Sequence, residues 1–465
     1  MKRRRLHLGR LLLVNAVYAM AALVGWPVYL FLLATRRKYR NRFWQRWGLV
    51  PRFGGRGARA GGQRRDSSAA LQNDTQGAEA RGTGNPQRFW VHAISIGETE
   101  AARTFVPALA AAYPEAEIVL STTTMTGQER ARKLFPDRPV FYFPLDLGPC
   151  VLLALRRVRP PAVIQVESEW WPNFFLLANL LGVPTLAVNV RITERSCERY
   201  RRIRRLMGAV FNTAAAIGVQ AEAYRERLLS LGADEARLRV TGQMKHDGVT
   251  FADTVPGAEE LAREVGIEKG EQVFVAGSTG PGEEDVLAAA YREARRAFPR
   301  LRLVIVPRRP ENFDAAAQAV LAAGLGVVRR SRSVTWEGPK ILPPVILGDT
   351  LGELMKWYAL ADIVFVGRSL APVGGSNPME PGSLGKPLLW GPHMFNFPVE
   401  SAELMEAGAA RVVENDSDVA AALVDLLTHG ERRRQMGEAA RAAIRRMQGA
   451  TARNIDLVRK ALENI

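Results

Sequence analysis

Cysteine and histidine are scarce in this chain. Its 465 residues include only two cysteines, Cys150 and Cys197, and five histidines. No disulfide framework is implied, because disulfide-stabilised folds carry several closely spaced cysteines. Histidines and cysteines at the spacing of a zinc site are also missing, so no metal site is expected. The chain must therefore be held together by hydrophobic cores, and its length is sufficient for two domains.

Acidic residues are almost absent from the first part of the chain. The net charge is +17, but residues 1–88 contain 18 Lys and Arg against 3 Asp and Glu, so the rest of the chain carries only +2. A nucleic-acid groove needs a basic face on the folded body. The charge instead surrounds a hydrophobic segment, which argues against nucleic acid as a partner and favours an anionic membrane surface.

Residues 11–34 form an uncharged apolar run long enough to cross a bilayer, which takes about 20 apolar residues. Basic residues flank the run on both sides, and the second flank also holds Phe43, Trp44 and Trp47, which suit a membrane interface. A cleaved signal peptide is not indicated, because the run is too long and lacks a small-residue cleavage site. We expect residues 1–50 to be a membrane anchor. It is either a single span with a cytoplasmic body or a helix lying in the inner leaflet.

The remainder of the chain is an expected linker followed by a regular α/β pattern. Residues 51–88 are rich in Gly, Arg, Ser, Gln and Asn, the composition of a flexible linker. From residue 89 on, apolar strand-like segments alternate with helix-like segments, which predicts mostly parallel sheets with helices on both faces. The expected strands are 89–95, 117–124, 139–146, 162–168, 184–190, 272–278, 301–307, 326–331, 344–349, 363–369, 387–392 and 410–415.

A pause in this series near residues 242–248 divides the body into two domains of similar size. We expect an N-terminal Rossmann-like domain at 89–243 and a C-terminal one at 244–465. As an alternative, the last helix returns to the first domain. In such sheets ligands bind at the carboxyl ends of the strands, so the functional residues should follow the strands directly.

Carboxylates follow two expected strands of the first domain. Glu98 stands where a helix begins, so it is either a general base or a plain helix-start residue. Glu167 and Glu169 follow another strand together with Trp170 and Trp171. We expect the tryptophans to pack under the next helix, and the role of Glu169 stays open.

The second domain offers three segments that suit anions or nucleotides. The Gly-rich turn 277–285 either cradles phosphate with its N–H groups or caps a helix. Arg308 and Arg309 follow a strand, where guanidinium groups either bind phosphate or carboxylate or are simply solvated. Segment 374–387 combines four glycines with Glu380, and glutamates of this kind grip ribose hydroxyls in nucleotide-sugar enzymes. A tight turn with a helix cap is the alternative for that segment.

A run of arginines in the first domain is either a solvated face or, beside a membrane anchor, a surface that meets lipid phosphates. Its members are Arg191, Arg195, Arg199, Arg201, Arg202, Arg204 and Arg205.

Taken in order, these segments resemble the lipid A-specific Kdo (3-deoxy-D-manno-octulosonic acid) transferase family of Gram-negative bacteria. The similarity covers roughly residues 89–460, together with the anchor and its basic tail. A single matching string of residues would be a weak indication of this family, but nine matching strings in the same order are a strong indication. They are HAISIGETEAA (92–102), STTTMTGQERA (121–131), ESEWWPN (167–173), NVRITERS (189–196), TGQMKHD (241–247), VPRRPENF (306–313), GDTLGEL (348–354), NPMEPGSLGKP (377–387) and GPHMFNF (391–397).

The resemblance implies a GT-B fold, with two facing Rossmann-like domains and an N-terminal membrane-anchoring helix. The first domain would bind the acceptor and the second the donor. It implies transfer of Kdo from CMP-Kdo to a lipid A precursor in lipopolysaccharide core biosynthesis, by direct displacement. The body would lie on the cytoplasmic side of the bacterial inner membrane. The expected partners are CMP-Kdo, the lipid A precursor and the anionic lipid surface, with no cofactor and no metal.

The resemblance also assigns roles to individual residues. Glu98 would be the proton acceptor. The expected donor-binding residues are Ser278, Thr279, Pro307, Arg308, Leu351, Gly352, Glu353, Asn377, Pro378, Met379 and Glu380. The candidates for acceptor binding are Gly97, Arg191, Arg201 and Arg202.

The sequence departs from the family pattern at four positions, all on the donor side. Gly280, Arg309 and Ser376 stand where the family usually has histidine, and Arg368 stands where it usually has glycine. Two other functions therefore stay open. One is a membrane-bound transferase for a different nucleotide sugar, and the other is an inactive membrane scaffold with the same fold. The intact Glu98, Asn377 and Glu380 argue against the scaffold.

Overall fold

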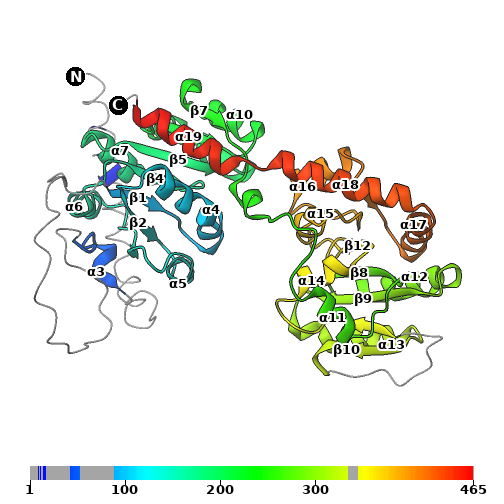
Figure 1. The fold of residues 1–465 in the computed structure, drawn as a ribbon. Helices are drawn as coiled ribbons and strands as arrows, with labels where there is room; N and C mark the ends of the chain where they lie inside the picture. Colours follow the sequence, from blue (N-terminus) through cyan, green and yellow to red (C-terminus); the bar gives the residue numbers. More distant parts are fainter. Residues whose placement is uncertain are drawn as a thin grey trace, which may run out of the picture. The chain divides into compact units, whose positions relative to one another are not determined.

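The computed structural model describes residues 9, 11, 14–16, 42–52, 88–332 and 344–463. The chain divides into two compact units (Figure 1). The first is formed by Met1–Gly248 with Gly449–Ile465, and the second by Val249–Gln448. Each unit contains a parallel sheet of seven strands with helices on both faces. The prediction of two Rossmann-like α/β domains is confirmed.

The first sheet has the strand order β3-β2-β1-β4-β5-β6-β7, and all neighbouring strands are parallel. Its strands are β1 (Arg88–His92), β2 (Glu117–Thr122), β3 (Val140–Tyr142), β4 (Val163–Val166), β5 (Thr185–Val190), β6 (Ala216–Val219) and β7 (Leu238–Val240). Its helices are α3 (Phe43–Arg46), α4 (Ile96–Ala112), α5 (Met125–Leu134), α6 (Gly148–Val158), α7 (Pro172–Leu180), α8 (Glu194–Arg201), α9 (Arg204–Phe211), α10 (Glu222–Ser230) and α19 (Ala450–Glu463), with the 3-10 turns η1 (Glu235–Arg237) and η2 (Met244–Gly248).

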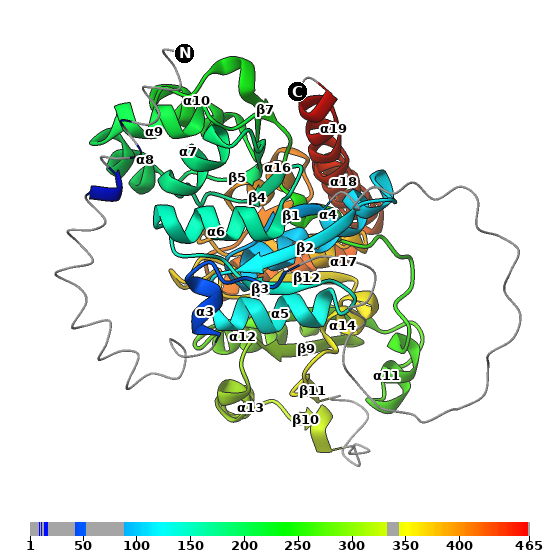
Figure 2. The same ribbon diagram turned by 90° about the vertical axis from the view of Figure 1, so that its left-hand side faces the viewer.

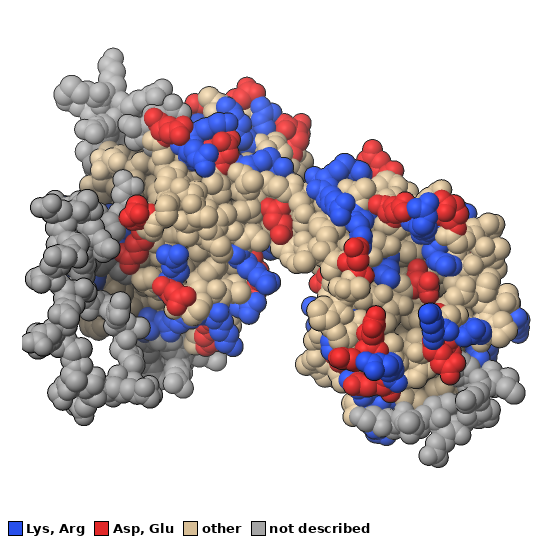
Figure 3. All heavy atoms as spheres, viewed as in Figure 1, with Lys and Arg blue, Asp and Glu red and all other residues tan. Residues whose placement is uncertain are grey.

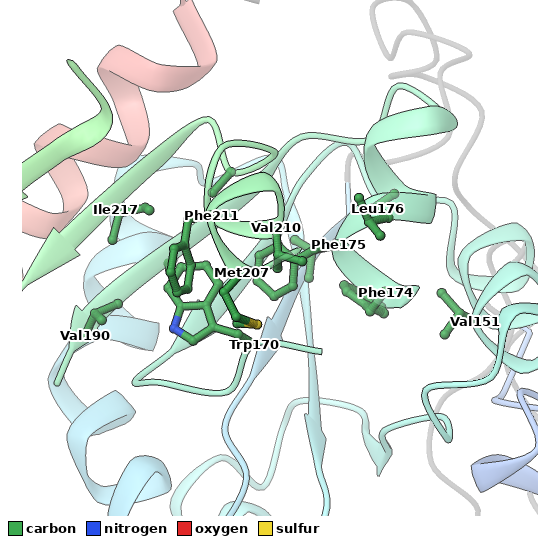
Figure 4. Packing of buried hydrophobic residues seen from close by; sticks show 14 of the residues in the cluster. Val151, Trp170, Phe174, Phe175, Leu176, Val190, Met207, Val210, Phe211 and Ile217 are labelled. Atoms are coloured by element: carbon green, nitrogen blue, oxygen red, sulfur yellow. The ribbon is translucent and has the colours of Figure 1, made fainter. Parts of the chain in front are cut away.

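Both faces of this sheet are buried, which explains why its strands are continuous apolar runs. Because alternate residues of a strand point to opposite faces, Phe89 and Val91 pack in a cluster with α4 and α19. Trp90 between them packs in the other cluster, under α6, α7 and α9. Figure 2 shows β2 and β3 between α6 and α5. Figure 4 shows Trp170 in the cluster that contains Trp90. The rings of Trp170 and Phe211 pack edge to face there, with their centroids 4.8 Å apart.

The second sheet has the order β10-β11-β9-β8-β12-β13-β14, again with parallel neighbours. Its strands are β8 (Gln272–Thr279), β9 (Leu301–Pro307), β10 (Val327–Arg329), β11 (Val345–Leu347), β12 (Ile363–Val366), β13 (Leu388–Trp390) and β14 (Ala410–Val412). Its helices are α11 (Ala258–Glu264), α12 (Glu283–Ala297), α13 (Phe313–Ala322), α14 (Leu354–Leu360), α15 (Met379–Ser383), α16 (Pro398–Glu406), α17 (Asp416–Thr428) and α18 (Gly430–Met447), with the 3-10 turns η3 (Pro310–Asn312) and η4 (Arg330–Arg332).

The chain passes between the units twice, and α19 packs on α4 of the first unit (Figure 1). The hydroxyl groups of Thr104 and Thr451 are 2.8 Å apart across this contact. Asp247 holds the start of α19, since its carboxylate accepts hydrogen bonds from the N–H groups of Gly449 (2.6 Å) and Thr451. Gly449 has a φ of 93°, which glycine adopts readily.

Most of the expected anchor, 1–50, and nearly all of the expected linker, 51–88, lie outside the described residues. None of the helices in the described ranges is both long and apolar enough to span a membrane. Asn15 contacts the first unit. Its side chain donates a hydrogen bond to Asn173 and accepts one from the N–H of Gly148, each at 3.0 Å. The membrane anchor stays a prediction.

Candidate active site

The order of strands reverses once in each sheet, between β1 and β4 in the first and between β8 and β12 in the second. At such a reversal the loops that leave the two neighbouring strands diverge, and ligands bind in the crevice at their carboxyl ends. Several of the candidate residues follow strands at these reversals. They are Glu98 after β1, Glu167 and Glu169 after β4, Ser278 and Thr279 at the end of β8, and Arg368 after β12.

Glu98 is the third residue of α4 and forms a capping box with Ser95. Its Oε2 atom accepts hydrogen bonds from the backbone N–H of Ser95 (3.0 Å) and from the Ser95 hydroxyl. Its Oε1 atom has no hydrogen bond to any residue in the described ranges. Helix capping therefore occupies one oxygen of this half-buried carboxylate and leaves the other able to accept a proton.

Two further carboxyl groups lie close enough to Glu98 to respond to its charge. Burial, and next the Glu98 carboxylate, raises the pKa of Glu169 to about 7. Burial also raises the pKa of Glu167, and Lys245 opposes this shift with its Nζ 3.4 Å from Oε1 of Glu167. Glu167 has a φ of 66°, a strained conformation of the kind that clusters at functional sites. Sequence reasoning singled out neither Lys245 nor its pairing, because the two residues are 78 positions apart.

Several donor-side candidates come together at the carboxyl edge of the second sheet. Arg308 follows β9 and is exposed, while Asn377 and Glu380 lie at the start of α15. The Asn377 side-chain amide donates a hydrogen bond to Glu380 (3.2 Å). Burial raises the pKa of Glu380, and this bond and the positive charge of Arg308 oppose the shift. Arg308 and Glu380 are therefore close enough to interact.

Tyr358 of α14 belongs to the same cluster and was not predicted. Burial, and next the charge of Glu380, raises the pKa of Tyr358 strongly, while a hydrogen bond to Ser278 and the charge of Arg308 oppose the shift. The phenol is therefore neutral. The position of this phenol also explains why residue 277 is a glycine, because a Cβ atom there would lie 2.2 Å from the Tyr358 hydroxyl. A tyrosine inside a helical pattern indicates core, so the sequence held no sign of this contact.

The string from Leu351 to Glu353 follows β11, a neighbour of β9. Leu351 is 74% exposed. Glu353 accepts hydrogen bonds from Thr350, Arg330 (3.2 Å) and Lys356 (3.5 Å). Burial favours its neutral form, but the bonds from Thr350 and Arg330 outweigh burial and hold the pKa of Glu353 below its usual value. The remaining donor-side candidates are Thr279 and Met379, which are buried, Pro307, which ends β9, Pro378 and Gly352.

Glu283, the first residue of α12, connects the loop after β8 with the loop after β12. It was not singled out from the sequence. It is 1% exposed. Its carboxylate accepts hydrogen bonds from the backbone N–H groups of Gly280 (2.9 Å), Arg368 (2.6 Å), Ser369 (2.8 Å) and Leu370 (3.0 Å). An internal carboxylate thus occupies N–H groups of the kind that cradle a phosphate. The N–H of Gly280 in the Gly-rich turn is not free for that role.

The candidates for acceptor binding lie in the first unit. Gly97 directly precedes Glu98 in α4. The arginines of the run, Arg191, Arg195, Arg199, Arg201, Arg202, Arg204 and Arg205, are all exposed on or beside α8 and α9. Within the described part of the chain, ion pairs involve none of these seven side chains. On the face that Figure 3 shows, basic and acidic side chains are otherwise interspersed over both units.

A metal-binding group is not found among the residues that the structure describes. No three of their His, Cys, Asp and Glu side chains are grouped so that they could hold a metal ion.

Known proteins resemble this chain over most of its length. A family model described as 3-deoxy-D-manno-octulosonic-acid transferase (kdotransferase) matches residues 42–248. The 3-deoxy-D-manno-octulosonic acid transferase of Haemophilus influenzae is 33% identical over 385 residues, which are 81% of this chain and 88% of that protein. That of Bordetella pertussis is 33% identical over 377 residues, 79% of this chain and 86% of that protein.

The crystal structure of a glycosyltransferase from Rickettsia africae shares the fold. It covers 82% of this chain and 100% of its own, with a TM-score of 0.55 at 12% identity. Together with the sequence relatives, this defines the protein as a glycosyltransferase with two Rossmann-like domains. The chain belongs to the 3-deoxy-D-manno-octulosonic acid transferase family. The resemblance inferred from the nine strings is confirmed.

Proposed function

We propose that this protein transfers Kdo from CMP-Kdo to a lipid A precursor, with Glu98 as the general base. The observation that carries the proposal is where the candidate residues gather. Glu98 follows a strand at the order reversal of one sheet, while Arg308, Asn377 and Glu380 gather at the carboxyl edge of the other. Family membership supports the reaction class.

In the proposed step, Oε1 of Glu98 accepts the proton of a sugar hydroxyl on the lipid. The hydroxyl oxygen bonds to the anomeric carbon of Kdo while the bond from that carbon to the phosphate oxygen breaks. CMP leaves with the electron pair. The exposed guanidinium of Arg308 suits two phosphate oxygens, and Glu380 suits ribose hydroxyl donors. The step uses no metal and no cofactor.

The acceptor and the membrane belong to the same proposal. Gly97 lies next to the proposed base, and Arg191, Arg201 and Arg202 offer exposed positive charge to lipid phosphates. The protein would act on the cytoplasmic side of the bacterial inner membrane, held there by residues 1–50.

A pair of variants separates the base from the helix cap. Glu98→Gln keeps the capping box, since glutamine also serves in it, but cannot accept the proton. We expect it to lose about 10²–10⁴-fold in kcat while its melting temperature and CMP affinity are kept. Ser95→Ala removes the partner of the cap, costs about 1 kcal/mol of stability and keeps most of the turnover. If Glu98→Gln turns over at the wild-type rate, Glu98 is only a cap.

A transferase for another nucleotide sugar is the second candidate, favoured by the donor-side departures at Gly280 and Arg368. Competition between nucleotides distinguishes the two. We expect CMP to inhibit transfer at a much lower concentration than UDP or GDP. The reverse order would assign a different donor, and the lack of both binding and turnover would indicate a scaffold.

A further inference from the structure

Arg368 adopts a backbone conformation that arginine seldom adopts. It follows β12 at the strand-order reversal with a φ of 62°, in the left-handed region where a side chain is strained. Its backbone is fixed on both sides, because its N–H donates to Glu283 (2.6 Å) and its carbonyl accepts from Gly375 (2.8 Å). Glycine would make the same two bonds without strain. The fold therefore does not require an arginine here, and retained strain of this kind points to the side chain.

The side chain of Arg368 leaves the strand toward the Gly-rich turn. A Cβ atom placed on Gly280 would lie 3.2 Å from the Cγ atom of Arg368, closer than side chains usually pack. Gly280 does not itself have a positive φ, so what its missing side chain provides is room. The two residues are thus complementary, a small one beside a large one.

In the described ranges the guanidinium group of Arg368 forms neither a hydrogen bond nor an ion pair. The nearby carboxylate of Glu283 is already bonded to four backbone N–H groups. This half-buried cation, which has no counter-ion among the residues that the structure describes, lies at the carboxyl edge of a parallel sheet, where ligands bind.

We propose that Arg368 binds an anionic group of the donor and helps to determine donor specificity in this chain. The inference rests on the proposed function, in which the donor is CMP-Kdo. That donor carries two anions, the phosphate of the nucleotide and the carboxylate of the sugar acid. Both fit the planar fork of a guanidinium group. Gly280 keeps the approach of the arginine side chain open.

The test compares the wild type with Arg368→Gly by calorimetric titration of CMP, by KM for CMP-Kdo and by thermal unfolding. Arg368→Gly relieves the backbone strain and removes the guanidinium. We expect its melting temperature to rise by about 1–3 °C. We expect CMP affinity or donor KM to worsen by about 10- to 100-fold, the range for a lost charge-assisted hydrogen bond. Gain of stability with loss of donor binding is a combination that a structural role of the side chain would not produce.

The matched control is Arg159, which also has a positive φ (51°) but lies at the end of α6 in the first unit. Arg159→Gly should raise the melting temperature similarly and leave both donor constants unchanged. Gly280→Ala probes the complementary position, since its new methyl group would displace the side chain of Arg368. We expect it to weaken donor binding in the same direction by a smaller factor.

The outcomes also distinguish the two anions. Loss of CMP affinity in Arg368→Gly identifies the phosphate, while unchanged CMP affinity with a raised KM for CMP-Kdo identifies the carboxylate. If the wild type binds CMP and Arg368→Gly leaves both constants unchanged, this inference fails and the proposed function stands. If the wild type does not bind CMP, both fail.

Discussion

Glu169 carries a carboxyl group that has no hydrogen bond to the residues in the described ranges, although it lies near Glu98. With a pKa of about 7, it is neutral in roughly half of the molecules at neutral pH. A neutral Glu169 places no second negative charge beside the proposed base. The ionised form of Glu169 also acts on Tyr200. Burial, and next the charge of Glu169, raises the pKa of Tyr200.

This raised pKa has a consequence for stability. Between about pH 4.5 and 7 the folded protein binds more protons at Glu169 than the unfolded chain does, so the free energy of unfolding falls as pH rises through this window. Glu169→Gln removes this contribution. Compared with the wild type, we expect the free energy of unfolding of the variant to be higher by on the order of 2 kcal/mol at pH 8 and nearly the same at pH 4. Urea unfolding at the two pH values measures the difference, and identical pH slopes for variant and wild type would contradict it.

Single residues of the site differ in how far the sequence reveals them. The positions of Glu98, Arg308 and Glu380 could be predicted, because each comes after a strand or a Gly-rich turn, and their roles stay predictions. Tyr358 and Glu283 could not. Their roles depend on contacts with the Gly277 turn and the loop after β12, and spacing along the chain does not encode these contacts.

At the scale of elements, the loops after β8 and β12 are joined by the carboxylate of Glu283. Glu283→Gln would turn an amide group toward backbone donors and leave buried N–H groups unsatisfied. We expect a loss of about 3 kcal/mol in the free energy of unfolding. Glu284→Gln is the control, because Glu284 is also buried, but its carboxylate accepts hydrogen bonds from the Thr279 hydroxyl (2.6 Å) and from its own backbone N–H and joins no second loop. Chemical denaturation compares the two variants, and equal losses would show that the shared contact is unimportant.

Strands were predicted well where both faces are buried and poorly at their ends. β9 (Leu301–Pro307) coincides with the expected strand. β2 ends at Thr122 and β12 at Val366, so both are shorter than the expected strands 117–124 and 363–369. The final residues of these expected strands belong to the loops that carry candidate site residues. β6 and β7 were missed. β6 is short and follows alanines, and two of the three residues of β7 are exposed, so neither shows a distinct apolar run.

At the scale of the whole molecule, substitution of exposed arginines on or beside α8 and α9 tests whether they bind the proposed lipid acceptor. Replacing Arg201 and Arg202 together with alanine should raise KM for a lipid A precursor in anionic vesicles by about 10- to 30-fold, since each charge near such a surface contributes about 1 kcal/mol. KM for CMP-Kdo should stay unchanged. Arg434→Ala is the control, because Arg434 is exposed but paired with Glu431 and Glu438 in α18. Similar effects of both changes on the lipid KM would remove the arginine run from acceptor binding.

The two-sheet architecture and the family could be predicted from the chain as a whole, since the α/β alternation and the order of nine strings persist over most of its length. The residue contacts between distant segments could not. The return of the last helix to the first domain was one of the alternatives, but a local pattern does not indicate that Thr104 of α4 meets Thr451 of α19, 347 positions away. The anchor at residues 1–50 stays a prediction, because most of it lies outside the described residues.

The most direct test of the proposed reaction is the mass of the lipid product. The protein with residues 1–50 included is incubated with CMP-Kdo and a bis-phosphorylated, tetra-acylated lipid A precursor, and the mass of the lipid is measured by mass spectrometry. We predict a gain of one or more Kdo units with the wild type and with Ser95→Ala, and no detectable gain with Glu98→Gln in the time that the wild type needs for full conversion. An unchanged lipid mass from folded wild-type protein that binds CMP would contradict the proposed transfer.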